Sequence, residues 1–310
     1  MTKPSDHTIR MDRALAVLHG LTIGDAFGQQ FFSPGIPQWC ISQRKPPPPV
    51  WRYTDDSEMA MGIVEVLAEH GRVEQDALAT RFGERFAADP TRGYGPAAIR
   101  ILHAISQGES WRTVSRAVFG GAGSFGNGGA MRVAPVGAYF RDDFEEVARQ
   151  AAASAEITHA HEEGIAGAIA IAVATAWCCR QSRDTMLSGQ EMLETVRDYT
   201  PQGAVRLGIE EAIGMALDEW EFTAVNLLGN GSRITARDTV PFCLWSAAAH
   251  VNSFTDAMWA TMRVGGDVDT NCAIVGGIVA AATGLDGIPD EWIASRERLQ
   301  LAGLAGEMPH

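Results

Sequence analysis

The sequence has no basic run and no cysteine framework, and each absence argues against a class of protein. Lysine and arginine form no cluster and the formal net charge is −13, which disfavours a surface that binds nucleic-acid or membrane phosphates. The five cysteines are an odd number. Cys178 and Cys179 are adjacent and the others are scattered, so we predict neither a disulfide framework nor a zinc site. We expect a cytoplasmic protein with no direct nucleic-acid surface and no membrane partner.

Strand-like patterning and a long hydrophobic run are also missing. Alternating β-branched residues are nearly absent, and the one weak strand candidate is SRITARDTV, at 232–240, which disfavours a fold built on a sheet. The longest apolar run, from Gly164 to Cys179, falls short of the roughly 20 residues that span a bilayer. We expect a buried helix there. The first ten residues, MTKPSDHTIR, lack a signal-peptide pattern, and residues 1–10 are expected to be flexible.

Helical periodicity is what the sequence has instead. The chain has 310 residues, 46% hydrophobic and 20% charged, and nothing marks a break between two cores. Small residues in GIAGAIAIAVATA and AIVGGIVAAATG indicate central helices that others surround. We therefore predict an all-α fold, a compact orthogonal helical bundle forming a single domain over residues 11–310. Apolar residues recur at helical spacing in the segments 11–26, 58–68, 75–86, 144–155, 164–177, 204–217, 255–262 and 273–282.

Two adjacent carboxylates, Asp55 and Asp56, lie in WRYTDDSEMAMG, where a proline-rich loop (31–53) becomes an apolar run. One interpretation is helix capping, because Asp55 and Glu58 have the spacing of a capping box. The other is a metal site, because neighbouring carboxylates repel and stay ionised most easily beside a cation. Taken alone, the segment favours capping. The long loop before it is a candidate flap or lid.

A second acidic cluster contains Asp267, Asp269 and Thr270, in VGGDVDTN, where a Gly-Gly turn precedes an apolar helix. A calcium loop counted from Asp267 fails, because position six is Cys272 instead of glycine and position twelve is Ile278 instead of glutamate. Carboxylate and hydroxyl oxygens suit hard cations such as Mg²⁺ or Mn²⁺ and suit zinc poorly. If the two clusters meet in space, capping alone does not explain them.

A glycine-rich segment, GAGSFG at 121–126, matches the G-x-G-x-x-G pattern of dinucleotide-binding proteins. That pattern has meaning only between a strand and a helix, and the sequence predicts no such strand. For an isolated glycine cluster, a flexible turn is the default interpretation.

An ordered set of motifs resembles the ADP-ribosylglycohydrolase family, which includes the dinitrogenase-reductase-activating glycohydrolase and the eukaryotic ADP-ribosyl hydrolases. In order, the motifs are GLTIGDAFG, YTDDSEMA, GSFGNGGAMRVAPVG, ITHAHEEG and GGDVDT. The resemblance implies that family's all-α fold, with two Mg²⁺ or Mn²⁺ ions at the bottom of a cleft. There the bond between ADP-ribose and an acceptor is hydrolysed, so the implied partner is an ADP-ribosylated protein or an ADP-ribose derivative.

The resemblance also implies residue roles. The implied metal ligands are Thr54, Asp55, Asp56, Asp267, Asp269 and Thr270, and the implied catalytic residues are Asp55, Asp56 and Asp269. The implied substrate-binding residues are Gly123, Ser124, Phe125, Gly126, Asn127 and His159. Among them Ser124 and the loop N–H groups would hold the pyrophosphate, Phe125 would stack on adenine, and Asn127 would hold the loop or a ribose hydroxyl. His159 would lie near the distal ribose, whereas His161 is expected to be structural, and Asp25 either supports the metal site or is simply a satisfied buried carboxylate.

One departure concerns a flap glutamate that family members usually carry after the GDAxG motif. Between Asp25 and Asp55 this chain has no acidic residue, and the corresponding position is Phe32. Gln29 or Gln30 could offer a neutral oxygen, a carboxylate from elsewhere could fill the space, or catalysis could be altered or lost. The predicted function is a metal-dependent hydrolase of O-linked ADP-ribose, on serine or in poly(ADP-ribose). An arginine-directed N-glycohydrolase and a non-catalytic ADP-ribose-binding protein are the alternatives.

Overall fold

The computed structural model describes residues 6–32, 38–181 and 186–302, and within these ranges every regular element is a helix. Trp51 with Arg296, and Gly126 with Thr235, form the isolated β-bridges of the described chain. The prediction of an all-α fold is confirmed. All five cysteines are free and buried, as expected for a chain without a disulfide framework.

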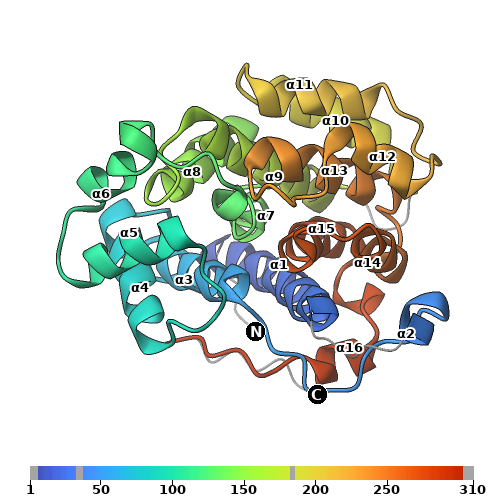
Figure 1. Cartoon of the computed structure of the whole chain (residues 1–310), viewed down its shortest axis with the longest axis horizontal. Helices are drawn as coiled ribbons and strands as arrows, with labels where there is room; N and C mark the ends of the chain where they lie inside the picture. The colour runs from blue at the N-terminus through green and yellow to red at the C-terminus, as the bar shows by residue number, and fades with distance from the viewer. Residues whose placement is uncertain (1–5, 33–37, 182–185, 303–310) are drawn as a thin grey trace.

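Helices α1 (Asp6–Gln29) and α15 (Val268–Thr283) form the centre of the molecule (Figure 1). They pack closely because glycines face the partner backbone. A Cβ on Gly24 would lie 2.1 Å from the carbonyl oxygen of Cys272, and one on Gly20 would lie 2.7 Å from the carbonyl oxygen of Gly276. No side chain fits at those distances, so the two backbones touch. The predicted role of small residues in a central helix is therefore met in α15.

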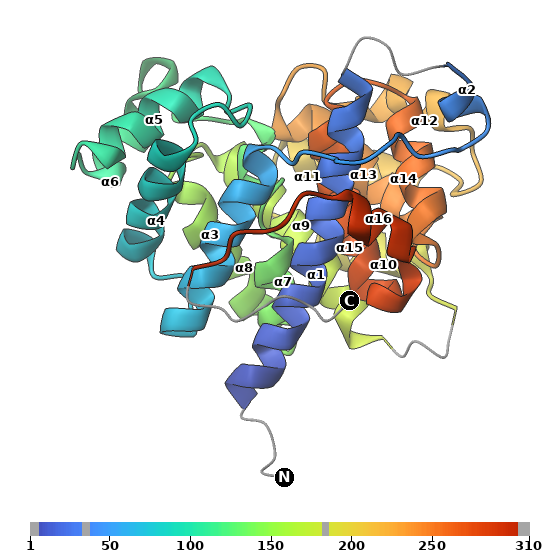
Figure 2. The same cartoon turned by 90° about the horizontal axis from the view of Figure 1, so that it is seen from below.

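The remaining helices surround this pair (Figures 1 and 2). Next to it lie α3 (Asp55–His70), α7 (Ala134–Tyr139) and α9 (Glu162–Arg180). On one side are α4 (Gln75–Ala88), α5 (Pro96–Ser106), α6 (Trp111–Ala117) and α8 (Phe144–Glu156). On the other side are α10 (Gly189–Tyr199), α11 (Ala204–Ile213), α12 (Glu221–Leu228), α13 (Ala236–Ala249) and α14 (Phe254–Arg263). The short elements are α2 (Gln38–Ser42), α16 (Asp290–Ser295), η1 (Gln30–Phe32), η2 (Phe119–Gly121), η3 (Asn127–Gly129) and η4 (Leu285–Gly287).

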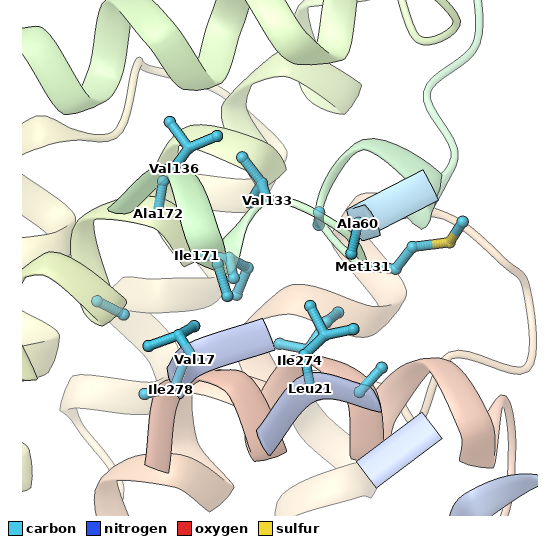
Figure 3. Packing of buried hydrophobic residues seen from close by; sticks show 14 of the residues in the cluster. Val17, Leu21, Ala60, Met131, Val133, Val136, Ile171, Ala172, Ile274 and Ile278 are labelled. Carbon is cyan, nitrogen blue, oxygen red and sulfur yellow. The ribbon is translucent and has the colours of Figure 1, made fainter. Parts of the chain in front are cut away.

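The core between these helices is aliphatic. Figure 3 shows Leu21 of α1, Ile274 of α15 and Ile171 of α9 converging, with Val133 and Val136 above them. By length and composition α9 is apolar enough to cross a membrane, but 83% of its most apolar window is buried inside the protein. The sequence-based prediction of a buried helix in this segment is confirmed.

Helix α1 begins at Asp6, before the predicted start at Met11. Polar contacts support this first turn: Arg10 pairs with Asp6 at 2.8 Å, and His7 Nδ1 lies 2.7 Å from the hydroxyl of Tyr139. Apolar periodicity does not register such contacts. Residues 6–10 of the predicted flexible segment are thus helical, and residues 1–5 lie outside the described residues. The single domain over 11–310 stays a prediction, since 303–310 lie outside them too.

The weak strand candidate at 232–240 is not a strand, since α13 begins at Ala236. Thr235 is the N-cap of α13, and its hydroxyl accepts a hydrogen bond from the backbone N–H of Asp238. An N-cap residue has extended backbone angles, so a cap followed by β-branched residues imitates a short strand. The long loop at 31–53 contains α2 in its described part, and residues 33–37 of this candidate flap lie outside the described residues.

The end of this loop is fixed by the C-terminal segment. Trp51 N–H donates to Ser295 O at 2.7 Å, and Glu297 N–H donates to Trp51 O at 2.9 Å. The carboxylate of Glu297 then accepts from the backbone N–H of Tyr53 at 2.9 Å and pairs with Arg92. These bonds fix the backbone of residues 51–53, which directly precede the first acidic cluster.

The substitution Gly24→Ala should lower the free energy of unfolding by about 3 kcal/mol, because a methyl group must push α1 away from the α15 backbone. Urea or thermal unfolding followed by circular dichroism measures the loss. The matched control is Gly214→Ala. Gly214 has an ordinary φ of −73°, and its Cβ would meet Glu211 O at 3.5 Å. We expect the control to change stability by less than about 1 kcal/mol; equal losses in both variants would contradict the close-packing argument.

Candidate active site

The two acidic clusters meet where α3 and α15 begin. Thr270 Oγ1 lies 3.5 Å from Asp56 Oδ2, across 214 positions of sequence. One carboxylate oxygen from each of Asp25, Asp56 and Asp269 lies within 4.8 Å of the other two. Asp25 lies on α1, so α1 contributes to the cluster together with α3 and α15. The structure thus gathers acidic groups from three helices into one largely buried place.

Asp25 ties α1 to the first turn of α3. Its carboxylate accepts hydrogen bonds from Thr54 N–H at 2.9 Å and Thr54 Oγ1 at 2.8 Å. It also accepts from Ser57 N–H at 3.1 Å and Ser57 Oγ at 2.5 Å. Asp25 is therefore a satisfied buried carboxylate, which confirms one of its two interpretations. It holds the residues that flank Asp55 and Asp56, and its support of a metal site stays a prediction.

The N-cap of α3 is Thr54, not Asp55, because the Thr54 hydroxyl accepts from the backbone N–H of Asp56. Asp55 is the first helical residue, so the proposed capping box with Glu58 is wrong. The carboxylate of Glu58 pairs with Arg85 at 2.9 Å and with Arg92 at 3.7 Å. Since capping uses Thr54, it gives no reason for the adjacent carboxylates.

Burial and mutual repulsion dominate the electrostatics. Burial, with the nearby charges of Asp25 and Asp267, raises the pKa of Asp55 to about 8. Burial also raises the pKa of Asp25 to about 6, against the opposing effect of its hydrogen bonds. The pKa values of Asp56 and Asp269 lie well above the ordinary range, first through burial and then through neighbouring carboxylates. Burial raises the pKa of Asp267 as well.

This arrangement fits a hard divalent cation. Asp56 Oδ1 is buried and accepts no hydrogen bond from the described residues, and an unpartnered buried carboxylate oxygen is costly unless a cation compensates it. The donors are all carboxylates and threonine hydroxyls, which Mg²⁺ and Mn²⁺ prefer. Asp25, Asp56 and Asp269 offer converging oxygens, and the other residues of the predicted ligand set lie on the same two helix starts: Thr54, Asp55, Asp267 and Thr270.

The glycine-rich loop joins the acidic cluster through Asn127. The Asn127 side-chain amide donates to Asp267 Oδ2 at 2.7 Å and to Thr239 Oγ1 at 3.1 Å. Gly123 has a φ of +76°, and a Cβ there would lie 2.8 Å from the backbone nitrogen of His161. Glycine is therefore required, and the loop is a fixed structure instead of the flexible turn that an isolated glycine cluster suggests.

An aromatic surface lies on the same loop. Phe125 is 39% exposed and Phe119 is 53% exposed, and their ring centroids are 5.5 Å apart. Sequence reasoning named Phe125 and missed Phe119, although an aromatic residue directly before the glycine run was the available signal. The buried Ser124 hydroxyl accepts from Gly126 N–H at 3.2 Å, which leaves its own proton free to donate.

The two histidines have different surroundings. Burial, reinforced by the charge of Arg132, lowers the pKa of His159 to about 3, so its imidazole is neutral. His161 is the N-cap of α9 and accepts from Glu163 N–H at 3.1 Å, which agrees with the structural role expected for it.

The position of the missing flap glutamate lies at the end of η1. Phe32 is 50% exposed there. Gln30 Nε2 donates to Ala26 O at 3.0 Å, so this amide is engaged with its own helix. The chain therefore has no carboxylate at the position of the flap glutamate, and the Gln30 amide does not replace it in this arrangement.

Comparisons with known proteins identify the family to which this chain is similar. The family model described as ADP-ribosylglycohydrolase matches residues 6–309. The chain is 31% identical over 289 residues to ADP-ribosylhydrolase ARH3 of Homo sapiens, covering 83% of this chain and 78% of that protein. It is 26% identical over 304 residues to ADP-ribosyl-[dinitrogen reductase] glycohydrolase of Rhodospirillum rubrum, covering 95% and 92%. A solved structure described as an ADP-ribosylglycohydrolase-related protein complex has the same fold, with a TM-score of 0.65, 23% identity and 94% coverage of each chain.

Without a divalent cation, the protein should become less stable as pH rises. The stability contribution of Asp25 and Asp55 is fully present below their ordinary pKa near 4. It is lost as pH rises through their folded values of about 6 and about 8, because the folded state then holds charges that the unfolded chain hydrates. We expect Mg²⁺ or Mn²⁺ to raise the Tm, measured by scanning fluorimetry, more at pH 8 than at pH 5. An equal rise at both pH values would contradict a cation bound among these carboxylates.

Proposed function

This chain belongs to the ADP-ribosylglycohydrolase family, a family of glycosidases, and we propose that it hydrolyses the glycosidic bond between ADP-ribose and a modified acceptor. The observation that carries the proposal is the largely buried cluster of Asp25, Asp56 and Asp269. Asp267, two residues before Asp269, accepts from Asn127 of the ordered glycine loop. The cluster supplies the chemistry, and the loop supplies a place for a nucleotide.

The reaction needs stabilisation of positive charge at the ribose C1″ atom and a water molecule that loses a proton. A bound Mg²⁺ or Mn²⁺, or a pair of them, would orient and acidify water. Asp56 Oδ1 accepts no hydrogen bond from the part of the chain that the structure describes, so it can hold a cation or accept a proton. We assign cation binding and the positioning of water to Asp55, Asp56 and Asp269, with Asp267, Thr54 and Thr270 completing the set of oxygen donors.

The substrate would lie along the glycine loop. Backbone N–H groups between Gly123 and Asn127, with the Ser124 hydroxyl, are suited to pyrophosphate oxygens. The exposed rings of Phe125 and Phe119 are suited to the adenine, because stacking on an aromatic face needs an exposed ring. His159 would contact the distal ribose. Asn127 already binds Asp267, which links the ligand loop to the cation site.

The acceptor we favour is O-linked. The segments GSFGNGGAMR and THA resemble the branch that acts on serine-linked or polymeric ADP-ribose, and relatives named ADP-ribosylhydrolase ARH3 are 28% to 31% identical. An arginine-directed N-glycohydrolase is the enzymatic alternative.

A second candidate function is binding without turnover. It is favoured by Phe32, which stands where the family usually has a flap glutamate, in a segment without any acidic residue from 26 to 54. Such a protein would retain ADP-ribose affinity and release no product.

A panel of serine-linked, arginine-linked and polymeric ADP-ribose substrates tests both functions. We expect release of free ADP-ribose from O-linked substrates with Mg²⁺ or Mn²⁺ and none with a chelator, measured by liquid chromatography and mass spectrometry. If ADP-ribose binds in a calorimeter but no substrate is cleaved with either cation, the enzyme proposal is wrong and the binding protein stands.

The variant Asp56→Asn should lower kcat on the preferred substrate by about 100-fold or more, since an amide cannot carry the charge that holds a cation. Its fold should persist, because burial already disfavours the charged form of this carboxylate. Asp286→Asn is the matched control: the residue is exposed and lies in η4, away from the acidic cluster. Near-wild-type turnover by Asp56→Asn would remove Asp56 from the catalytic set.

A further inference from the structure

Arg132 is a fully buried cation that the proposed function does not use. Its Nη2 donates to Ser154 O at 2.9 Å and to Thr158 Oγ1 at 2.9 Å. The guanidinium also lies over the ring of Phe82, 4.7 Å from its centroid. An arginine with no exposed surface loses a large hydration energy, so its position calls for a reason besides packing.

The contacts of Thr158 fix the direction of its hydroxyl. An arginine side chain has only donors, so Thr158 Oγ1 must accept from Arg132. The hydroxyl carries one proton, and His159 Nδ1, at 2.8 Å, is the acceptor available to it among the described residues. His159 Nδ1 therefore accepts, and in a neutral imidazole the proton must then be on Nε2.

His159 Nε2 faces the glycine loop. A Cβ on Gly128 would lie 2.9 Å from Nε2, so glycine at 128 leaves room for the ring. A Cβ on Gly126 would lie 3.2 Å from Nε2 and 3.2 Å from Ser124 Oγ. These two polar atoms thus border the same small space. His159 Nε2 makes no hydrogen bond to another described residue. The atom is not completely enclosed by protein, so a ligand can reach it.

We propose that Arg132 and Thr158 are positioning residues that hold His159 as the Nε2–H tautomer, aimed at an oxygen atom of ADP-ribose bound on the glycine loop. The identity of the ligand rests on the proposed function, whereas the relay from Arg132 through Thr158 to His159 does not. Because the imidazole is fixed as a neutral donor, it orients the ligand and takes no part in proton transfer during bond cleavage.

Nitrogen NMR of the full-length protein labelled at histidine tests the relay directly. The chain has eight histidines. The pair of nitrogen signals that disappears in the His159→Gln variant belongs to His159. We expect His159 Nε2 to be protonated and Nδ1 to be an unprotonated, hydrogen-bonded acceptor throughout pH 5 to 8. A protonated His159 Nδ1 in the wild-type protein overturns the proposal.

Thr158→Val removes the hydroxyl and nearly keeps the side-chain volume. We expect its His159 Nδ1 signal to move to the position of an imidazole nitrogen without a hydrogen-bond donor, and the Kd of ADP-ribose by calorimetry to rise about tenfold, the effect of losing one well-placed hydrogen bond. Thr158→Ser should restore both. The matched control is Thr175→Val in α9, another buried threonine, whose hydroxyl donates to Ile171 O at 2.9 Å; it should change neither readout.

The outcomes separate this inference from the proposed function. A Thr158→Val protein that binds ADP-ribose like the wild type overturns the positioning role. Absence of ADP-ribose binding by the wild-type protein, together with the expected His159 tautomer, would count against the proposed function and leave the relay supported.

Discussion

The contact between the backbones of α1 and α15 is the constraint on which the site depends. A Cβ on Gly24 would lie only 2.1 Å from Cys272 O, so the helices can approach this closely only with glycine there. That approach brings Asp25, the next residue of α1, beside Asp269 of α15. The carboxylate of Asp25 accepts hydrogen bonds from the hydroxyls of Thr54 and Ser57, and these bonds position the first turn of α3. One close packing therefore assembles acids from three helices.

The acidic residues of this cluster repel one another, and the fold holds them together despite that repulsion. Burial and mutual repulsion raise the pKa values of Asp55 and Asp56, and a protein rarely keeps such a cluster without compensation. The buried Arg132 is attracted to both carboxylates, but its Nη2 donates to Ser154 and Thr158 instead. The remaining negative charge is of the kind that a divalent cation would compensate.

Polar contacts also connect the acidic cluster to the glycine loop and to the C-terminal segment. Asn127 holds Asp267 from the loop side, and Glu297 holds Tyr53 and Arg92 from the C-terminal side. The backbone N–H of Asp55 in turn donates to the carbonyl oxygen of Arg92, with an N–O distance of 2.8 Å. Substrate binding and cation binding are thus expected to depend on one another, since both use groups whose positions these bonds determine.

The sequence by itself determined the helical class, through apolar periodicity and missing strands, and the two acidic clusters, through the order of the motifs. It did not reveal that Thr54 caps α3 or that Thr235 caps α13, because a cap depends on the backbone angles of one residue. Only the tertiary structure decided the place of Asp25 and the pairing of Arg132 with Thr158. These contacts join distant segments, and local spacing carries no information about which buried polar groups will meet.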